Sequence, residues 1–300
     1  MEKLRLYVSV YKAQVQSSLQ FTVPVSAGAA LYGGDIVPMD VRDDTGENIS
    51  DRNPQYCELT VQYWAWKQLR HQTEMPEYVG FMHRRRYFDF SDTHPLSRDN
   101  PVKTHRPYRI FNEPDEKTLE RICFNQDKIM SVISGYRFIA PLRENIFHTV
   151  LEQYNKNDRR EFDDMGLLCE IIKDKYPEYS AAAGKYLKGT YGYYCNMFIS
   201  DREMLDVYCT WLFDILSEYD RCKPKEMMYP REQGKLAERL FGIFMTYIKT
   251  ETDIRWAELP RAHFAKLEGA TANNNSFNRL TYSLFPPDSL RRRIIKKLKG

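Results

Sequence analysis

Residues 79–90 read V-G-F-M-H-R-R-R-Y-F-D-F. An apolar run over residues 78–82 ends at His83, and three arginines and Tyr87 follow before the carboxylate of Asp89. This pattern predicts a buried strand that ends in charge at the edge of a sheet. Ligands of open α/β sheets bind beyond the carboxyl ends of strands, so guanidinium groups there indicate a site for an anion such as phosphate. The alternative is that the arginines are solvated or pair with nearby carboxylates.

Composition indicates a packed globular protein. The chain has 300 residues, 42% of them hydrophobic and 14% aromatic, which suits one large α/β domain or two smaller ones. The 44 basic and 41 acidic residues leave a net charge of +3. Because that balance creates no global field toward nucleic acid, any basic function must be local.

Cysteine spacing and hydropathy predict the compartment. The six cysteines lack metal-type spacing, so we expect reduced thiols in a cytosolic protein. The N-terminus is too short and too charged to be a signal peptide, and no run approaches the roughly 18 apolar residues of a membrane span. We therefore expect a soluble or peripheral protein.

Hydrophobic periodicity predicts alternating strands and helices, which is typical of an α/β fold. Strands are expected over residues 4–10, 78–82, 136–142 and 254–259, and within 191–200 before a helix capped near Ser200 or Asp201. Helices are expected over residues 53–71, 115–133 and 233–248, with a helix-rich region over 146–187. The polar, proline-bearing stretch 91–116 is expected to be a long loop.

The helix expected over residues 53–71 is apolar around most of its circumference and should be buried. Glu58 and Lys67 then lie among aromatic side chains, where an unpaired charge is costly. Glu58 either takes part in a functional site or is a carboxylate that a neighbouring backbone group or arginine satisfies.

The tail, residues 289–300, reads S-L-R-R-R-I-I-K-K-L-K-G. Its aliphatic residues fall on one helical face and the other residues are mostly basic, which is typical of a helix that lies on an anionic membrane surface. A frayed basic terminus and a nucleic-acid-binding segment are the alternatives. An aliphatic face has no use in binding a phosphate backbone, so the pattern favours the membrane.

Six motifs resemble, in order, those of the bacterial polysaccharide glycosyltransferases built on unknown-function domain 4422. They are D-D-T-G-E-N-I-S at 43–50, N-P-Q-Y-C-E-L-T-V-Q-Y-W-A-W-K at 53–67, V-G-F-M-H-R-R-R-Y-F at 79–88, Y-C-N-M-F-I at 194–199, W-L-F-D-I-L at 211–216 and L-A-E-R-L-F-G at 236–242. The similarity runs over residues 5–265. The family usually reads H-Y-R-R-Y where this chain has Arg84 in place of the first tyrosine, so no stacking role of that ring is expected here.

The resemblance implies a glycosyltransferase-A fold, a doubly wound Rossmann-like α/β sheet with helical insertions. It implies a catalytic domain over residues 1–268, followed by a linker over 269–288 and the basic amphipathic helix of 289–300. Members are associated with capsule, exopolysaccharide and O-antigen synthesis, and some are galactofuranosyltransferases. The expected reaction is an inverting transfer of galactofuranose or galactose from a UDP-sugar to a growing lipid-linked polysaccharide.

The resemblance also implies partners and a place in the cell. The donor would be a nucleotide sugar and the acceptor a lipid-linked oligosaccharide, with no nucleic acid involved. We expect the protein on the inner face of the bacterial cytoplasmic membrane, held as a peripheral protein by its tail. The alternative is a transferase-like protein without activity that serves as a scaffold in polysaccharide assembly.

The expected donor site lies at the charged end of the strand. Most glycosyltransferase-A enzymes hold a divalent metal with a D-x-D motif, which this chain lacks there. One hypothesis is that Arg85 and Arg86, with His83, bind the diphosphate in place of the metal. The other is that Asp89 and His263 bind Mn or Mg.

The resemblance assigns further residues to the site. Glu238 is the candidate general base that deprotonates the acceptor hydroxyl, and Glu232 is the reserve. Glu238 is otherwise a boundary residue paired with Lys235 or Arg239. Asn196 is expected to face the donor or acceptor, or to be a hydrogen-bonded amide at a strand end.

Weaker assignments complete the expected site. Gly28, in a glycine-bearing loop without a phosphate-loop spacing, and Asp44 are expected near the donor. Glu58, Tyr63 and Trp66 are expected near the acceptor. The two aromatic residues are alternatively core side chains, because aromatics at helical spacing usually pack inward.

Overall fold

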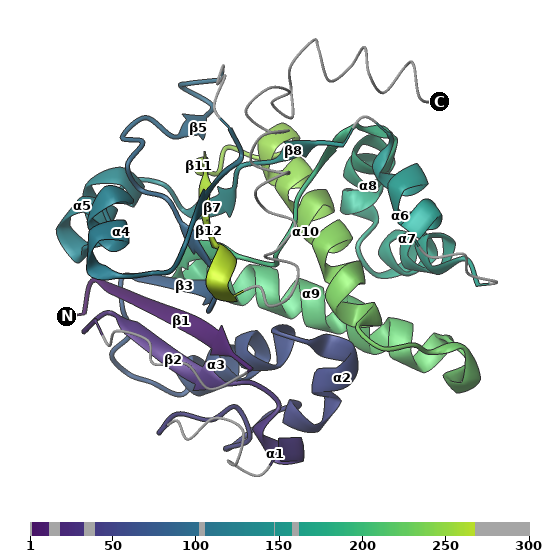
Figure 1. The fold of residues 1–300 in the computed structure, drawn as a ribbon. Helices are drawn as coiled ribbons and strands as arrows, with labels where there is room; N and C mark the ends of the chain where they lie inside the picture. The colour runs from purple at the N-terminus through teal and green to yellow at the C-terminus, as the bar shows by residue number, and fades with distance from the viewer. Residues whose placement is uncertain are drawn as a thin grey trace.

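The computed structural model describes residues 2–11, 19–32, 40–101, 106–146, 148–157 and 162–267, and Figure 1 shows its architecture. A mixed sheet lies between two layers of helices. Its ten strands are β1 (Leu4–Val10), β2 (Thr22–Ser26), β3 (Tyr78–His83), β4 (Arg86–Phe88), β5 (Leu96–Ser97), β6 (Tyr108–Phe111), β7 (Phe138–Pro141), β10 (Phe198–Asp201), β11 (Trp256–Leu259) and β12 (Arg261–Phe264). A second ribbon pairs β8 (Glu144–Asn145) with β9 (Tyr191–Gly192).

Ten α-helices are seen in the described part of the chain. They are α1 (Ala29–Tyr32), α2 (Asn53–Tyr56), α3 (Leu59–Arg70), α4 (Glu116–Arg121), α5 (Gln126–Ile133), α6 (Val150–Asn157), α7 (Asp164–Lys175), α8 (Ser180–Lys188), α9 (Arg202–Cys222) and α10 (Glu232–Thr250). Short 3-10 turns occur at Ser50–Arg52, Pro177–Tyr179, Lys225–Met227 and Ala265–Leu267. Within the described ranges, no helix is both long and apolar enough to cross a membrane.

Strand β3 is the centre of the sheet. Parallel β1 pairs with one side of it, and β2 continues the sheet beyond β1. Antiparallel β10 pairs with the other side, followed by β7 and β11. Gly80 permits this close packing, since a Cβ there would lie 2.6 Å from Leu6 Cδ2 and 2.7 Å from Ile199 Cγ1.

Alternating side chains divide the core between the two faces of the sheet. Tyr7, Val79 and Phe81 pack with the helices α3 and α7–α10, while Leu6, Val8 and Met82 pack with α4 and α5. In Figure 1 the long helices α9 and α10 accordingly lie on the opposite side of the sheet from α4 and α5. The α/β fold expected from the periodicity is confirmed.

The charged stretch after β3 is a tight hairpin. Arg84 and Arg85 form its two-residue turn, and Arg86 returns opposite His83 as the first residue of β4. The expectation of a buried strand that ends in charge is confirmed. Strand β4 in turn pairs with β12, and β12 pairs with β6, so the sheet extends beyond the hairpin.

Three local expectations are corrected. The helix expected over 53–71 breaks at Cys57, whose φ of 53° and ψ of −130° cannot continue a helix. The helix expected over 115–133 is two helices, because Asp115 and Asn125 each cap a separate N-terminus. The stretch 91–116 contributes β5 and β6 to the sheet, so it is not only a loop. The linker and the basic tail expected after residue 268 lie outside the described residues.

Candidate functional site

The carboxyl ends of five parallel strands, β1, β2, β3, β7 and β11, meet at one edge of the sheet. Antiparallel β10 lies between β3 and β7, so the segment just before it, residues 195–197, reaches the same edge. The start of α10 and the α2–α3 junction close over this edge, where Asn196 contacts Gly234 and Glu58. A polar cluster from distant parts of the chain is therefore assembled there.

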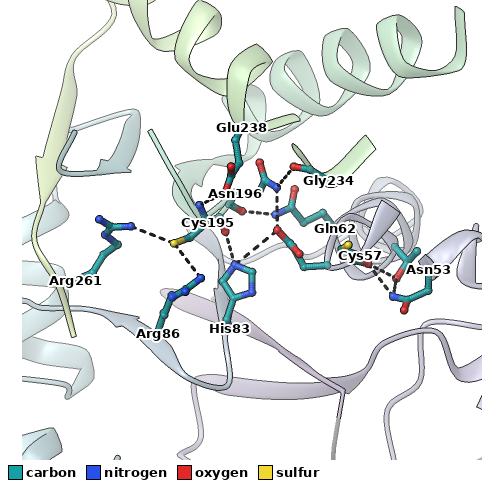
Figure 2. A network of polar contacts seen from close by, with 12 residues as sticks. Asn53, Cys57, Gln62, His83, Arg86, Cys195, Asn196, Gly234, Glu238 and Arg261 are labelled. Atoms are coloured by element: carbon teal, nitrogen blue, oxygen red, sulfur yellow. Dashed lines mark hydrogen bonds and ion pairs between the residues drawn. The ribbon is translucent and has the colours of Figure 1, made fainter. Parts of the chain in front are cut away.

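Cys195 is the centre of this cluster, as Figure 2 shows. Its Sγ accepts hydrogen bonds from Arg86 Nη1 at 3.4 Å and Arg261 Nη1 at 3.1 Å. Its backbone N–H donates to Glu238 Oε1 at 2.8 Å, and its carbonyl oxygen accepts from His83 Nε2. One buried residue thus holds two guanidinium groups, an imidazole and a carboxylate together.

The backbone around the cluster is strained. Cys195 and Asn196 have φ angles of 85° and 46°, and Cys57 lies nearby at 53°. Non-glycine residues in such conformations cost about 1–3 kcal/mol each and persist only where the surrounding structure enforces them. Their concentration at this edge is typical of a functional site.

Arg261 was missed by sequence reasoning. Its side chain is 1% exposed, and it donates to Cys195 and also pairs with Glu144 of β8. Its Nε, although buried, has no hydrogen-bond partner among the described residues. A charge buried in this way is rare without a function or full pairing. The signal in the sequence was the arginine that begins the short segment R-A-H-F of β12.

Both histidines of the cluster are neutral near pH 7. Burial lowers the pKa of His83, and burial together with Arg261, Arg86 and Arg85 lowers the pKa of His263 to about 2. The ring of His263 stacks on Tyr108 with centroids 4.4 Å apart. Since the guanidinium groups depress the pKa of this histidine, the structure brings Arg85, Arg86 and His263 into one electropositive region with His83.

Glu238 lies on α10 beside this region. Burial raises the pKa of its carboxyl group, although Arg239 and the N–H of Cys195 counteract the effect. Arg239 Nη1 donates to Glu238 Oε2 at 2.8 Å, so the expected pairing with Arg239 is present. The side chain of Glu238 remains 21% exposed, so a ligand can reach it.

Asn196 and Glu58 lie beside a small pocket. Asn196 Nδ2 donates to Glu58 Oε1 at 2.8 Å and to the Gly234 carbonyl at 2.9 Å, so the alternative of a hydrogen-bonded amide holds. His83 Nε2 is 4.0 Å from Glu58 Oε1. The pocket has room for about one water-sized group and is lined by Tyr7, Ser9, Glu58, Val61, Gln62, Phe81, Met82, His83 and Asn196.

Asp89 is not at this edge. The hairpin turns the chain back, which moves Asp89 roughly 10 Å from Arg86 along β4 and its extension. There its carboxylate is 3% exposed and accepts from Arg109 Nε at 2.5 Å and Ser91 Oγ at 2.7 Å. The placement of Asp89 beside the donor was therefore wrong, because the turn was not foreseen.

The structure does not bring Asp89 and His263 together as a metal site. Asp89 donates its N–H to the carbonyl of Pro260, whereas His263 pairs with Arg86 further along β12. Over the described ranges, no group of three His, Cys, Asp or Glu side chains is placed to hold a metal ion.

Glu232 is also corrected as the reserve base. Its side chain has no exposed area, and its carboxylate pairs with Lys223 and lies 2.8 Å from the hydroxyl of Tyr219. An acceptor hydroxyl cannot approach a carboxylate in that position.

The loop at Gly28 is occupied by a carboxylate of the chain itself. The N–H groups of Gly28 and Ala29 donate to Asp43 at 2.9 and 3.0 Å, and Ser50 Oγ donates to the same carboxylate. The positive φ of Gly28, 70°, serves this turn. Asp44 instead forms an ion pair with Arg42 at 2.6 Å. The N–H groups of this loop therefore bind Asp43, and the expected place of Gly28 and Asp44 near the donor stays a prediction.

Tyr63 and Trp66 form part of the core boundary. Trp66 is 5% exposed, stacks on Phe213 and donates its ring N–H to Asp206 at 2.8 Å. Tyr63 donates to Glu47 at 2.8 Å. Neither residue lines the pocket, so the alternative of packed aromatic side chains describes them.

A solved structure shares the architecture of this chain. The chain is similar to the apo structure of the bifunctional glycosyltransferase WbbM, with 27% identity, a TM-score of 0.75 and 88% of this chain covered. It spans about half of that protein, since the match covers 45% of the WbbM chain. The curated proteins contain no match to this sequence.

The likeness to WbbM and the mixed sheet between two helix layers show that the fold is of the glycosyltransferase-A type. The model of one protein family matches residues 5–250, which include β3, Cys195 and Glu238. The chain therefore belongs to the family described as a domain of unknown function, DUF4422.

Proposed function

We propose that this chain is a glycosyltransferase that takes its sugar from a nucleotide diphosphate donor. The similarity to WbbM supports sugar transfer in general. We propose further that the donor is a UDP-sugar, carrying galactofuranose or galactose, and that the acceptor is a growing lipid-linked polysaccharide. The basic segment 289–300 would hold the enzyme on the inner face of the cytoplasmic membrane.

The observation that carries the proposal is the convergence of Arg86 and Arg261 at the carboxyl edge of the sheet. Both reach Cys195 Sγ, a weak acceptor, so a phosphate oxygen entering beside it would offer a stronger partner. Arg85 adds a third guanidinium group to the same region. Fixed cations that neutralise the departing diphosphate lower the barrier to transfer, because its charge develops as the glycosidic bond breaks.

Glu238 is the proposed general base of an inverting transfer. Its carboxylate accepts a hydrogen bond from the Cys195 N–H, close to the arginine cluster, and its side chain is 21% exposed. A pKa raised by burial strengthens the carboxylate as a base for the proton of an attacking hydroxyl. Arg239 would stabilise the ionised form between turnovers.

Metal dependence follows from the same arrangement. If guanidinium groups neutralise the diphosphate, transfer continues in a stringent chelator. The competing version, in which Mn or Mg binds the diphosphate with protein carboxylates, requires complete loss of activity in chelator and recovery on addition of Mn. A chelator series on the purified protein separates the two versions directly.

The test of the proposed function is nucleotide binding. Purified protein is heated with UDP, UDP-galactose, UDP-galactofuranose, UDP-glucose, GDP-mannose or dTDP-rhamnose, with and without Mn. A ligand that binds only the folded state raises its stability by about 2.7 kcal/mol at a hundred times its Kd. We expect a UDP-sugar to raise the thermal stability of the protein. In a separate assay without acceptor, we expect slow hydrolysis of the same UDP-sugar.

Two matched variants test whether the nucleotide binds at the arginine cluster. The double variant Arg85→Ala, Arg86→Ala should lose the stabilisation, while Arg98→Ala, which removes an exposed arginine paired with Asp253, should keep it. If no nucleotide stabilises the wild type, the proposal is wrong and a transferase-like scaffold without activity becomes the better description.

A further inference from the structure

The pocket lined by Glu58 takes no part in the proposed diphosphate binding or in base catalysis by Glu238. It lies between β1, β3 and the start of α3, and Asn196 closes it from the side of α10. His83 lines it, and the same residue pairs across the hairpin with Arg86. The pocket is therefore directly next to the proposed diphosphate site.

The polar lining of the pocket is rich in hydrogen-bond acceptors. Gln62 Nε2 donates to the carbonyl oxygen of Asn196, and Asn196 Nδ2 donates to Glu58 and to Gly234. Both amide nitrogens are thus engaged, and reversing either amide would set its oxygen against another oxygen. The amide orientations are therefore fixed by their partners.

In this arrangement the amide oxygens of Gln62 and Asn196 accept no hydrogen bond from the described residues. Gln62 and Asn196 are 2% and 3% exposed, and within the described ranges neither Gln62 Oε1 nor Asn196 Oδ1 has a hydrogen-bond partner. Buried polar atoms are normally paired, so each exception calls for an explanation. Glu58 adds a carboxylate whose contacts are an amide N–H and, 4.0 Å away, a neutral imidazole.

A ligand of this pocket must donate hydrogen bonds. No arginine or lysine lines it, so it does not suit an anion. Its free space is about that of one water-sized group, which excludes a nucleoside, and Glu58 is the only carboxylate among its lining residues. A hydroxyl group meets these conditions, because its O–H donates to a carboxylate or amide oxygen.

We propose that this pocket receives a hydroxyl group of the donor sugar, with Glu58 as the acceptor that recognises it. The inference rests on the proposed function and names a specificity residue within it. The sugar of a nucleotide donor is bonded to the terminal phosphate, so it lies next to the group that Arg86 binds. Asn196 acts as a positioning residue, since its Nδ2 fixes the Glu58 carboxylate at 2.8 Å.

The test compares affinities for UDP and for the UDP-sugar that stabilises the wild type best, measured by calorimetry. In Glu58→Gln the amide oxygen can still accept from Asn196, so the fold is retained. A hydrogen bond to a charged group contributes about 1.5–3 kcal/mol, so the Kd for the UDP-sugar should rise roughly 10- to 100-fold. The Kd for UDP should not change.

Two further variants provide a second test of the pocket and a control. Ser9→Val narrows the pocket without changing charge and should also weaken the UDP-sugar selectively. Glu47→Gln removes a carboxylate that binds Lys67 and Tyr63 on a part of α3 away from the pocket, and should change neither Kd.

The outcomes are distinct. Equal affinity of wild type and Glu58→Gln for the UDP-sugar would overturn the inference and leave the proposed function intact. An unchanged donor Kd combined with a raised KM for the glycan acceptor would move the hydroxyl to the acceptor sugar, which also contradicts it. A wild type that binds neither UDP nor a UDP-sugar would contradict both proposals.

Discussion

Two charged clusters of this protein are built on opposite principles. The first, around Lys223, is closed: Lys223 Nζ is 2.7 Å from Asp164 and also pairs with Glu232, and all three side chains are at most 1% exposed. Tyr219 donates its hydroxyl to one of the two carboxylates at 2.6 Å and lies 2.8 Å from the other. Every charge there has a short, direct partner.

The second cluster, around Cys195, is open. Two guanidinium groups share a cysteine sulfur, which is a weak acceptor, and Arg261 also pairs with Glu144. Several buried polar atoms lack partners among the described residues, including Arg261 Nε, His263 Nε2 and Asn196 Oδ1. The backbone at Cys195 and Asn196 is strained.

The difference shows how a structural ion cluster can be told from a binding site. In the Lys223 cluster the charged groups pair with one another, and these ion pairs link the end of α9 to the starts of α7 and α10. The Cys195 cluster keeps unused hydrogen-bonding capacity that a ligand can satisfy, and it accepts a cost in stability. Substitutions should therefore affect activity at one cluster and stability at the other.

The largest effect is expected for Glu238→Gln. Loss of a general base typically lowers the rate about 10²- to 10⁴-fold, so kcat should fall by that order while the Kd for the donor stays unchanged. Steady-state transfer kinetics and donor calorimetry measure the two quantities. A kcat within a factor of a few of the wild type would exclude Glu238 as the base.

The next largest effect is expected for Lys223→Met. Removing one partner of a buried ion pair leaves uncompensated charges, so the free energy of unfolding should fall by about 3–5 kcal/mol. Urea unfolding gives this value. Activity per folded molecule should be unchanged below the transition, and a large loss of kcat in folded Lys223→Met would mean that the cluster is part of the catalytic site.

The pH dependence of the reaction sharpens the contrast. Burial raises the pKa of Glu238 above its usual 4.5, so the carboxylate is protonated and inactive as a base up to a higher pH than an exposed glutamate. The acid limb of the kcat profile should accordingly lie above pH 4.5 and should vanish in Glu238→Gln. A limb retained in that variant would assign it to another group.

The smallest effect is expected for Tyr63→Phe. The change removes a hydroxyl that donates to Glu47 at 2.8 Å, which contributes about 0.5–1.5 kcal/mol to stability. The KM for the acceptor should not change, because the ring of Tyr63 packs against Phe213 with centroids 5.0 Å apart and its hydroxyl is bound to Glu47. A raised acceptor KM would restore Tyr63 as an acceptor platform.

Much of the fold follows from local sequence patterns. The alternation of apolar and polar residues predicts β1, and the apolar run before His83 predicts β3 with its charged end at the sheet edge. Asp201 caps α9 as expected, since its side chain accepts from the N–H of Met204 at 2.8 Å. These features depend on neighbouring residues, which periodicity and capping rules can read.

Other features depend on tertiary context. The Arg84–Arg85 turn contains neither the glycine nor the asparagine typical of two-residue hairpins, so nothing in the sequence indicated that Asp89 moves away from the edge. The break at Cys57 is imposed where α10 packs close, since a Cβ on Gly234 would lie 3.2 Å from Cys57 Sγ. Arg261 joins the site through β12, whose pairing with β4 was not foreseen.

The most direct test of the difference between the clusters is the free energy of unfolding of Glu238→Gln at neutral pH, measured beside Lys223→Met. A carboxyl group with a raised pKa in the folded state stabilises the fold below its unfolded pKa and loses that contribution as pH rises through its folded pKa. At pH 7 the ionised Glu238 is thus a cost, and Glu238→Gln should gain about 0.5–2 kcal/mol, as substitutions that relieve a strained site commonly do. A loss of stability in Glu238→Gln comparable to that in Lys223→Met would contradict this account and make both clusters structural.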